Sequence, residues 1–240
     1  MVDANHLRFY CPTLPISPGQ QALLDAAQTL HARKVLRLKS GHRVELIDGQ
    51  GNLATAELEG FQGPRGVCRV IDLRHFDRPR PVLTVAAPLP KGPRANQMIN
   101  QLTQVGVDRF MPLQTQRGSV DPGPGKLQRF DRTVIESAKQ ARRLFLMQVN
   151  PPAKIEQVLT GSFDLRLLAQ PDAALRELRQ EQLRSARSIL ILIGPEGGFS
   201  RAELATLTSA NCLEWSLGPH VLRIETAAST AGAIIRYLAQ

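Results

Sequence analysis

Two glycine-containing loops in the last third of the chain are the segments best suited to chemistry. The first follows the apolar run Ile189–Ile193 and reads GPEGG over residues 194–198, and the second reads LGPHVLRIETA over residues 217–227. An apolar run that stops at Gly-Pro is typical of a strand that ends in a tight loop. Glycine lets the backbone lie close against a flat ligand. The two loops together predict one pocket made largely of main chain, at the carboxyl ends of strands.

Two other interpretations of the first loop are open. A lone Gly-Pro-Glu-Gly-Gly segment is often only a turn after a strand. A phosphate cradle is a further alternative, but its Gly-x-x-x-x-Gly-Lys-Ser/Thr spacing is missing and no Lys follows Gly198. The second loop favours a ligand pocket, and a side chain added at Gly197 is expected to enter it.

The paired segments ILIGPEGGFS (191–200) and LGPHVLRIETA (217–227) resemble the signature loops of the ribosomal RNA small subunit methyltransferase E family. This family lies within the SPOUT class of knotted S-adenosylmethionine (SAM) enzymes. Weaker similarity extends over nearly the whole chain, in segments 8–10, 31–37, 91–94 and 106–113. The chain departs from the family's pattern mainly where RNA would bind, at Gln101, Gln104, residues 115–118, residues 139–143, His220 and Ile224.

The resemblance implies an α/β fold with two domains. Residues 1–76 would form a small PUA-like β-barrel that binds RNA, and residues 77–240 a SPOUT methyltransferase domain. The parallel sheet of the second domain would end in a deep trefoil knot around the SAM loops. The implied activity is SAM-dependent methylation of N3 of a uridine in small-subunit (16S) ribosomal RNA, by a cytoplasmic homodimer. A SPOUT enzyme acting on a ribose 2'-hydroxyl or a pseudouridine nitrogen, and a ribosome-assembly factor without catalysis, remain alternatives.

The catalytic candidates are Arg223, Glu196 and Glu225. A uridine N3 must lose its proton, and a carboxylate with a pKa of ~4.3 is too weak a base to hold it. A fixed cation beside the pyrimidine would stabilise the anion as it forms. Arg223 suits this role, with the two glutamates orienting it or the substrate. The alternative for Arg223 is an ordinary salt bridge to one of them.

The resemblance also assigns the binding residues. Those expected against SAM are Leu168, Gly194, Pro195, Glu196, Gly197, Gly198, Leu217, Gly218, Val221, Leu222, Arg223, Ile224, Glu225 and Ala227. Those expected against RNA are Arg8, Arg33, Lys34, Arg37, Arg117, Arg142 and Arg143.

The charge balance favours a polyanionic partner. The chain carries a net +9 and has a pI near 10.2. Residues 77–150 hold 12 basic and 5 acidic side chains, a net +7, and the stretch 126–143 is the densest part. Aromatic residues make up only 5% of the chain, which argues against a stacking platform for single strands. Phosphate contacts to structured RNA fit better. A basic surface that serves only solubility remains the alternative.

Composition sets the remaining bounds. The 240 residues include no stretch as apolar as a membrane span, and the N-terminus lacks the pattern of a secretory signal. Cys11, Cys68 and Cys212 lie far apart and are expected to be reduced thiols. The five histidines form no ligand pattern with cysteines or acids, so we expect no metal.

The expected elements change character after the charged, proline-rich linker at 74–81. Before it, strands are expected at 44–47, 54–58 and 66–70 and a helix at 20–35. After it, strands alternate with helices, as in a parallel α/β sheet. The strands are expected at 82–87, 109–113, 163–169, 189–193 and 213–217, and the helices at 91–105, 126–143, 173–183, 201–210 and 226–238.

Three details of these helices are predicted. In the second helix after the linker, Phe130, Val134, Ile135 and Ala138 are expected to point inward. Ser200 and Glu203 should form a capping box at 201–210, and the last helix should be capped by Glu225 or Thr226. The last helix is also expected to build a dimer interface, from the small residues Ala227, Ala228, Ala231 and Gly232 and the apolar residues Ile234, Ile235 and Leu238.

Overall fold

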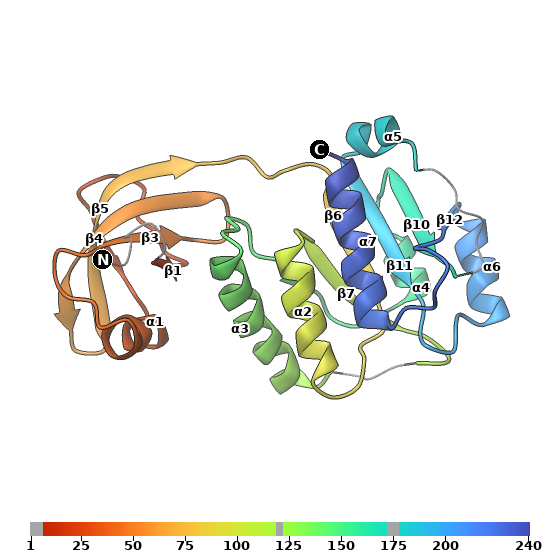
Figure 1. The fold of residues 1–240 in the computed structure, drawn as a ribbon, viewed down its shortest axis with the longest axis horizontal. Helices are drawn as coiled ribbons and strands as arrows, with labels where there is room; N and C mark the ends of the chain where they lie inside the picture. The colour runs from red at the N-terminus through yellow and green to blue at the C-terminus, as the bar shows by residue number, and fades with distance from the viewer. Residues whose placement is uncertain (1–6, 119–121, 172–177) are drawn as a thin grey trace. The chain divides into compact units, whose positions relative to one another are not determined.

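The chain forms two compact units (Figure 1). The computed structural model describes residues 7–118, 122–171 and 178–240. Unit 1 comprises Met1–Arg78 and Ala138–Leu146, and unit 2 comprises Pro79–Ser137 and Met147–Gln240. The first crossing lies in the expected linker. Unit 1 is nevertheless discontinuous in sequence, because residues 138–146 pack with it. The expected division into residues 1–76 and 77–240 does not include this second segment.

Unit 1 is built on a five-stranded sheet that forms a half-barrel. Its strands run in the order β1-β3-β4-β5-β2. β1 is parallel to β3, and the other neighbours are antiparallel. Alternate side chains point into one apolar core that includes Phe9, Leu46 and Leu58. The strand bounds are Arg8–Tyr10 (β1), Gln21–Leu23 (β2), Arg43–Ile47 (β3), Asn52–Gln62 (β4) and Arg65–His75 (β5).

The helix expected at 20–35 is wrong at its start. Residues Gln21–Leu23 form β2, in which Ala22 is buried and pairs with Cys68 of β5. The helix α1 (Ala26–Leu30) begins only after Asp25, whose side chain accepts a hydrogen bond from the Gln28 amide at 2.7 Å. A π-helical turn, His31–Val35, continues α1. Asp25 is a good N-cap residue, and it separates strand from helix here.

Unit 2 contains a parallel sheet of seven strands, which confirms the expected α/β class. The order is β12-β10-β11-β6-β7-β8, and β9 also pairs with β7. All neighbouring strands of this sheet pair in parallel. β8 and β9 were not predicted, because two residues carry no periodicity. The bounds are Val82–Ala87 (β6), Arg109–Gln114 (β7), Gln148–Val149 (β8), Ala153–Lys154 (β9), Leu165–Ala169 (β10), Ser188–Ile193 (β11) and Leu213–Trp215 (β12).

Helices cover both faces of this sheet. On one face α7 packs against α2, β6 and β11, and Figure 1 shows α2 and α7 side by side. On the other face α4 and α6 enclose a core with Leu190 and Leu192 of β11. The helix bounds are Arg94–Gln104 (α2), Pro124–Gln140 (α3), Ile155–Leu159 (α4), Gln180–Ser185 (α5), Arg201–Ser209 (α6) and Ile224–Leu238 (α7).

The predicted helix details are confirmed only in part. The capping box is present: Ser200 Oγ accepts from the Glu203 amide at 3.3 Å, and Glu203 Oε2 accepts from the Ser200 amide at 2.7 Å. The cap expected for the last helix is wrong, because Arg223 occupies the N-cap position with extended backbone and makes no side-chain cap. In α3, Ile135 is half-buried, whereas Phe130, Val134 and Ala138 are buried.

Two further helix boundaries differ from expectation. Leu178 and Arg179 are not helical and α5 begins at Gln180, while residues 172–177 of the expected helix lie outside the described residues. The short helix α4 was not predicted at all. Its five residues are too few to show helical periodicity in the sequence.

The small-residue face of α7 has a different partner from the one expected. Ala228, Ala231 and Ile235 are fully buried inside unit 2. A Cβ added at Gly232 would lie 2.9 Å from a Val107 methyl group. These small residues therefore let α7 lie close to α2 and the segment that follows it, and they are not available to a second subunit.

Some general properties follow from the same structure. Within the described residues no helix is long and apolar enough to cross a membrane. Across these same ranges, no three His, Cys, Asp or Glu side chains gather as a metal site. The three cysteines are free thiols. Burial raises the pKa of Cys68 to about 12, so this thiol stays protonated at neutral pH.

Candidate cofactor and RNA site

A cavity of about 350 Å³ opens at the carboxyl ends of β10 and β11. Three segments form it: residues 169–171 after β10, the first glycine loop after β11, and the second glycine loop together with the start of α7. Because neighbouring parallel strands end at the same edge of the sheet, their loops meet there. Its lining residues are Ala169, Gln170, Pro171, Ile193, Gly194, Pro195, Glu196, Gly198, Phe199, Leu217, His220, Val221, Leu222, Arg223, Ile224 and Ala227.

Most of the residues expected against SAM line this cavity. Four of the predicted SAM-binding residues do not line the cavity: Leu168, Gly197, Gly218 and Glu225. Leu168 points instead into the core between the sheet, α4 and α6. The lining residues that sequence reasoning missed are Ala169, Gln170, Pro171, Ile193, Phe199 and His220. Pro171, which stops the apolar run of β10, was the available signal for the first three.

Glycine is required at particular points of these loops. Gly198 has φ +68° and Gly218 has φ +124°, which side chains rarely adopt. A Cβ on Gly194 would lie 3.1 Å from the Phe199 ring, so glycine there lets this ring pack over the loop. At Gly197 an added Cβ would face Arg117 at 3.6 Å, an ordinary contact, and not the cavity. The expectation that a side chain at Gly197 would enter the pocket is therefore wrong.

Arg94, the first residue of α2, joins the two glycine loops. Its Nη1 lies 3.2 Å from Glu196 Oε1 and 3.6 Å from Glu225 Oε1. The Glu225 side chain is buried, and its Oε2 has no hydrogen-bond partner among the described residues. Arg94 was missed as a site residue, since its partners lie more than a hundred positions further along the chain.

Arg223 lies at the rim of the cavity. It is exposed, it lines the cavity, and it precedes α7 directly. In the described parts of the chain it makes no ion pair, because Glu196 and Glu225 pair with Arg94. The salt bridge considered as an alternative role for Arg223 is therefore absent among the described residues.

A second segment supports the first loop from outside. The Arg117 Nη1 donates to the Gly197 carbonyl at 2.9 Å, and the Gln116 amide donates to Glu203 Oε1 at 2.8 Å. Burial acts to raise the pKa of Glu203, but hydrogen bonds from the Ser200 and Gln116 amides outweigh it and lower this pKa. Glu203 is therefore a carboxylate at neutral pH and links the segment at 115–118 to the start of α6.

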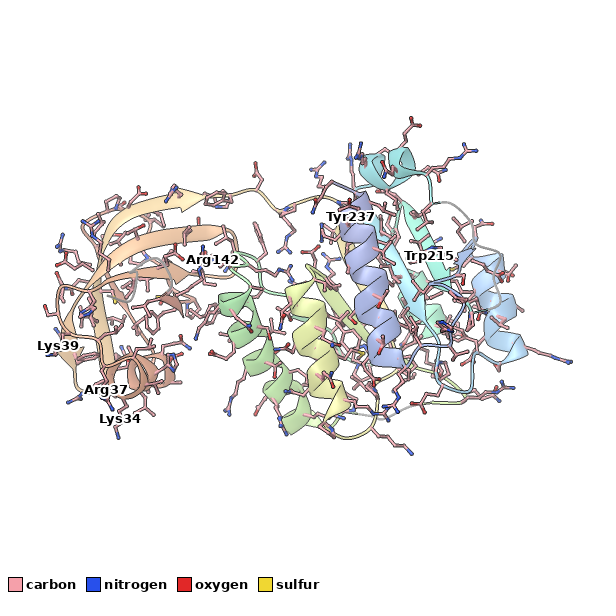
Figure 2. The ribbon with its side chains drawn as sticks, in the orientation of Figure 1. Lys34, Arg37, Lys39, Arg142, Trp215 and Tyr237 are labelled. Atoms are coloured by element: carbon pink, nitrogen blue, oxygen red, sulfur yellow. The ribbon has the colours of Figure 1, made fainter. Side chains whose placement is uncertain are left out.

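The residues expected against RNA fall into different environments. Lys34 and Arg37 are exposed after α1, with Lys39 nearby at one end of unit 1 (Figure 2). Arg33 is also exposed and lies over the Phe61 ring. Arg8 is different: its side chain is 8% exposed and pairs with Glu45 at 2.6 Å. An RNA contact for Arg8 does not fit this arrangement, because the charge is buried and already neutralised within the sheet.

The remaining two basic candidates follow α3. Arg142 is exposed and adopts φ +56°, and Arg143 is half-buried. The turn is closed by the Arg143 amide, which donates to the Ala138 carbonyl at 2.9 Å. The backbone of both arginines is thus fixed in unit 1, and Figure 2 labels Arg142 there.

Comparisons with known proteins define the class. A family described as an RNA methyltransferase domain matches residues 78–236, and one described as an RNA methyltransferase PUA domain matches residues 24–70. Two solved structures are similar over almost the full chain. A ribosomal RNA small subunit methyltransferase E from Neisseria gonorrhoeae bound to SAM has a TM-score of 0.86 and 25% identity, covering 97% of both chains. A putative methyltransferase from Legionella pneumophila with bound SAM has a TM-score of 0.85 and 27% identity, covering 96% of this chain and 97% of that one.

Curated relatives give the particular family. The ribosomal RNA small subunit methyltransferase E of Mycobacterium bovis is 35% identical over 244 residues, covering 94% of this chain and 90% of the relative. The Bacillus subtilis protein of the same name is 29% identical, covering 86% of each chain. The chain belongs to the ribosomal RNA small subunit methyltransferase E family.

Proposed function

We propose that this protein is a SAM-dependent methyltransferase that acts on N3 of a uridine in small-subunit ribosomal RNA. The cavity formed by the two glycine loops, with the exposed Arg223 at its rim, carries this proposal. Relatives named for small-subunit ribosomal RNA methylation and neighbours with bound SAM support it.

The cavity suits SAM in size and lining. Its volume of about 350 Å³ lies in the range of small-molecule sites. Ile193, Phe199 and Leu222 supply apolar walls for an adenosine, and the loop backbone supplies donors and acceptors for its polar edge. Glu196 is positioned for a cationic group of the ligand. When bound, SAM supplies an electrophilic methyl group on a sulfonium centre.

The protein's own residues must then favour the ionised pyrimidine. With the ~10 of a phenol as a guide to its acidity, ionising N3 at pH 7 costs about 4 kcal/mol. Arg223 sits at the rim of the cavity, where its guanidinium can stabilise the negative charge that develops. The proton leaves to solvent, so no strong base is required of Glu196 or Glu225. Holding N3 in line with the methyl group supplies further rate.

Identification of the product nucleoside tests this function. We expect small-subunit RNA incubated with SAM and the purified protein, then digested, to yield 3-methyluridine by mass spectrometry. A ribose-methylated nucleoside or a methylated pseudouridine would replace this proposal by one of the other SPOUT activities. RNA binding without any methylated product would indicate an assembly factor.

RNA docking is proposed for the exposed basic residues Arg33, Lys34 and Arg37 of unit 1 and for Arg142 and Arg143. Replacing Arg142 and Arg143 together by Gln is expected to weaken RNA binding. The slope of log K against the logarithm of salt concentration should become less steep by about one to two, because up to two phosphate contacts are lost. Turnover at saturating RNA should be retained. An unchanged salt slope would mean that these two charges do not meet phosphate.

A homodimer is also proposed, with a contact surface different from the small-residue face. Tyr237 is 74% exposed on α7, and Ile234 on the same helix is half-buried. Light scattering should give twice the chain mass of 26.4 kDa, and Tyr237→Asp should shift the mass toward the monomer by placing a charge in the contact. A monomeric wild type with full activity would exclude the dimer.

Three further expectations belong to this proposal. They are the trefoil knot around the glycine loops, a cytoplasmic location and a reaction that needs no metal. An experimental chain trace tests the knot, and cell fractionation tests the location. Methylation measured in the presence of a chelator tests the metal requirement, and the rate should not fall.

A further inference from the structure

Two arginines outside the glycine loops hold adjacent residues of the first loop. Arg94, at the start of α2, contacts the Glu196 side chain, and Arg117, in the segment after β7, contacts the Gly197 carbonyl. Neither arginine lines the cavity, whereas Pro195, Glu196 and Gly198 do. The loop that forms one wall of the cavity is therefore fixed from behind at two consecutive positions.

The Arg94 contact reaches both glycine loops at once. One guanidinium nitrogen lies 3.2 Å from Glu196 in the first loop and 3.6 Å from Glu225 at the start of α7. Glu225 is buried and has one oxygen without a partner among the described residues, so Arg94 is the charge that compensates it. Removal of Arg94 would leave a buried carboxylate uncompensated, and both loops would lose their common anchor.

Arg117 lies in a short segment, residues 115–118, that is held in place by hydrogen bonds. Thr115 Oγ1 donates to the Gly118 carbonyl at 2.6 Å, and the Gln116 amide donates to Glu203. A Cβ on Gly118 would lie 2.7 Å from the Pro195 side chain, so this segment lies directly against the loop. With its backbone fixed in this way, Arg117 presents Nη1 to the Gly197 carbonyl.

We infer that Arg94 and Arg117 are positioning residues that hold Glu196 and Gly197 in the conformation that binds SAM. This inference rests on the proposed SAM site. A loop that is already ordered loses less conformational entropy when it binds its ligand. Arg117 thereby acts on the cofactor loop, in place of the RNA contact that the family resemblance implied for it.

The test is SAM affinity in the absence of RNA. Calorimetry measures this affinity directly, and the fluorescence of the single tryptophan, Trp215, two residues before the second loop, is a second readout. Arg94→Gln and Arg117→Gln are each expected to weaken SAM binding about tenfold, which corresponds to about 1.4 kcal/mol. The control is Arg184→Gln, an exposed arginine of α5, which removes the same charge away from the loops and should leave SAM affinity unchanged.

The outcomes separate this inference from the proposed function. A wild type that does not bind SAM overturns the proposed function and the inference together. A wild type that binds SAM, with both Gln variants binding equally tightly, overturns only the inference. Loss of RNA affinity in Arg117→Gln with unchanged SAM affinity makes Arg117 an RNA contact and also overturns it.

A second variant covers the case in which Arg94→Gln fails to fold. Arg94→Lys keeps the charge that Glu225 needs, but its side chain is one bond shorter, so its ammonium falls short of the Nη1 position that contacts both carboxylates. It should unfold at the wild-type temperature and still bind SAM more weakly. Wild-type SAM affinity in Arg94→Lys would mean that charge compensation alone is needed and that Arg94 does not position the loops.

Discussion

Arg223→Ala should lower turnover by roughly two to three orders of magnitude, the usual loss for one electrostatic stabiliser of a developing anion. Arg223 is exposed at the rim of the cavity, and its charge is not taken up by Glu196 or Glu225, which pair with Arg94. Its guanidinium is therefore available to the pyrimidine of the proposed substrate. RNA affinity should hardly change, because the charge of the ionised base exists only during the reaction.

Single-turnover kinetics at saturating RNA and SAM would measure this effect. Arg223→Lys should recover part of the rate, since it restores a cation without the guanidinium geometry. Arg201→Ala is a suitable control, because Arg201 is exposed at the start of α6 and does not line the cavity. A higher reaction pH ionises more of the substrate and should narrow the gap between Arg223→Ala and wild type. An Arg223→Ala variant with wild-type turnover would assign the stabilising charge to another group.

The parts of the site that were predicted are those whose signal is local in the sequence. A Gly-Pro stop after an apolar run marks a strand end, and both glycine loops were found in this way. Residues 169–171 were missed although Pro171 marks a strand end, because they join the cavity only through the strand order β12-β10-β11. The order of strands in a sheet depends on packing between distant segments, and a local strand-end signal does not show which loops lie next to each other.

The errors over charged residues have the same origin. From the sequence, Arg8 was expected to contact RNA and Arg94 was given no role in the site. In the structure Arg8 is neutralised by Glu45 across β1 and β3, while Arg94 bridges two loops of the cavity. The small face of α7 was correctly identified as a packing face, but it packs against its own unit. The residue type shows that a side chain needs an opposite charge or a packing surface, but it does not show which part of the chain supplies it.

Ala227→Leu is expected to weaken SAM binding by roughly ten- to a hundredfold. Ala227 lies on the first turn of α7 and lines the cavity, so the added carbons of leucine enter the space proposed for the cofactor. Forcing extra methylene groups into a filled site costs about 1–3 kcal/mol. Leucine is nearly as good a helix former as alanine, so α7 itself should be retained.

Calorimetry with a chelator present measures this loss without interference from any metal. Ala205→Leu, on the exposed side of α6, makes the same change away from the cavity and should bind SAM as the wild type does. Ala228→Leu makes the change one residue further along α7, where the side chain is fully buried against unit 2, and it should lower the unfolding temperature as well. Ala227→Leu should instead unfold close to the wild-type temperature, because the cavity has room for the side chain when SAM is absent. Unchanged SAM affinity in a folded Ala227→Leu variant would show that the cofactor binds outside this cavity.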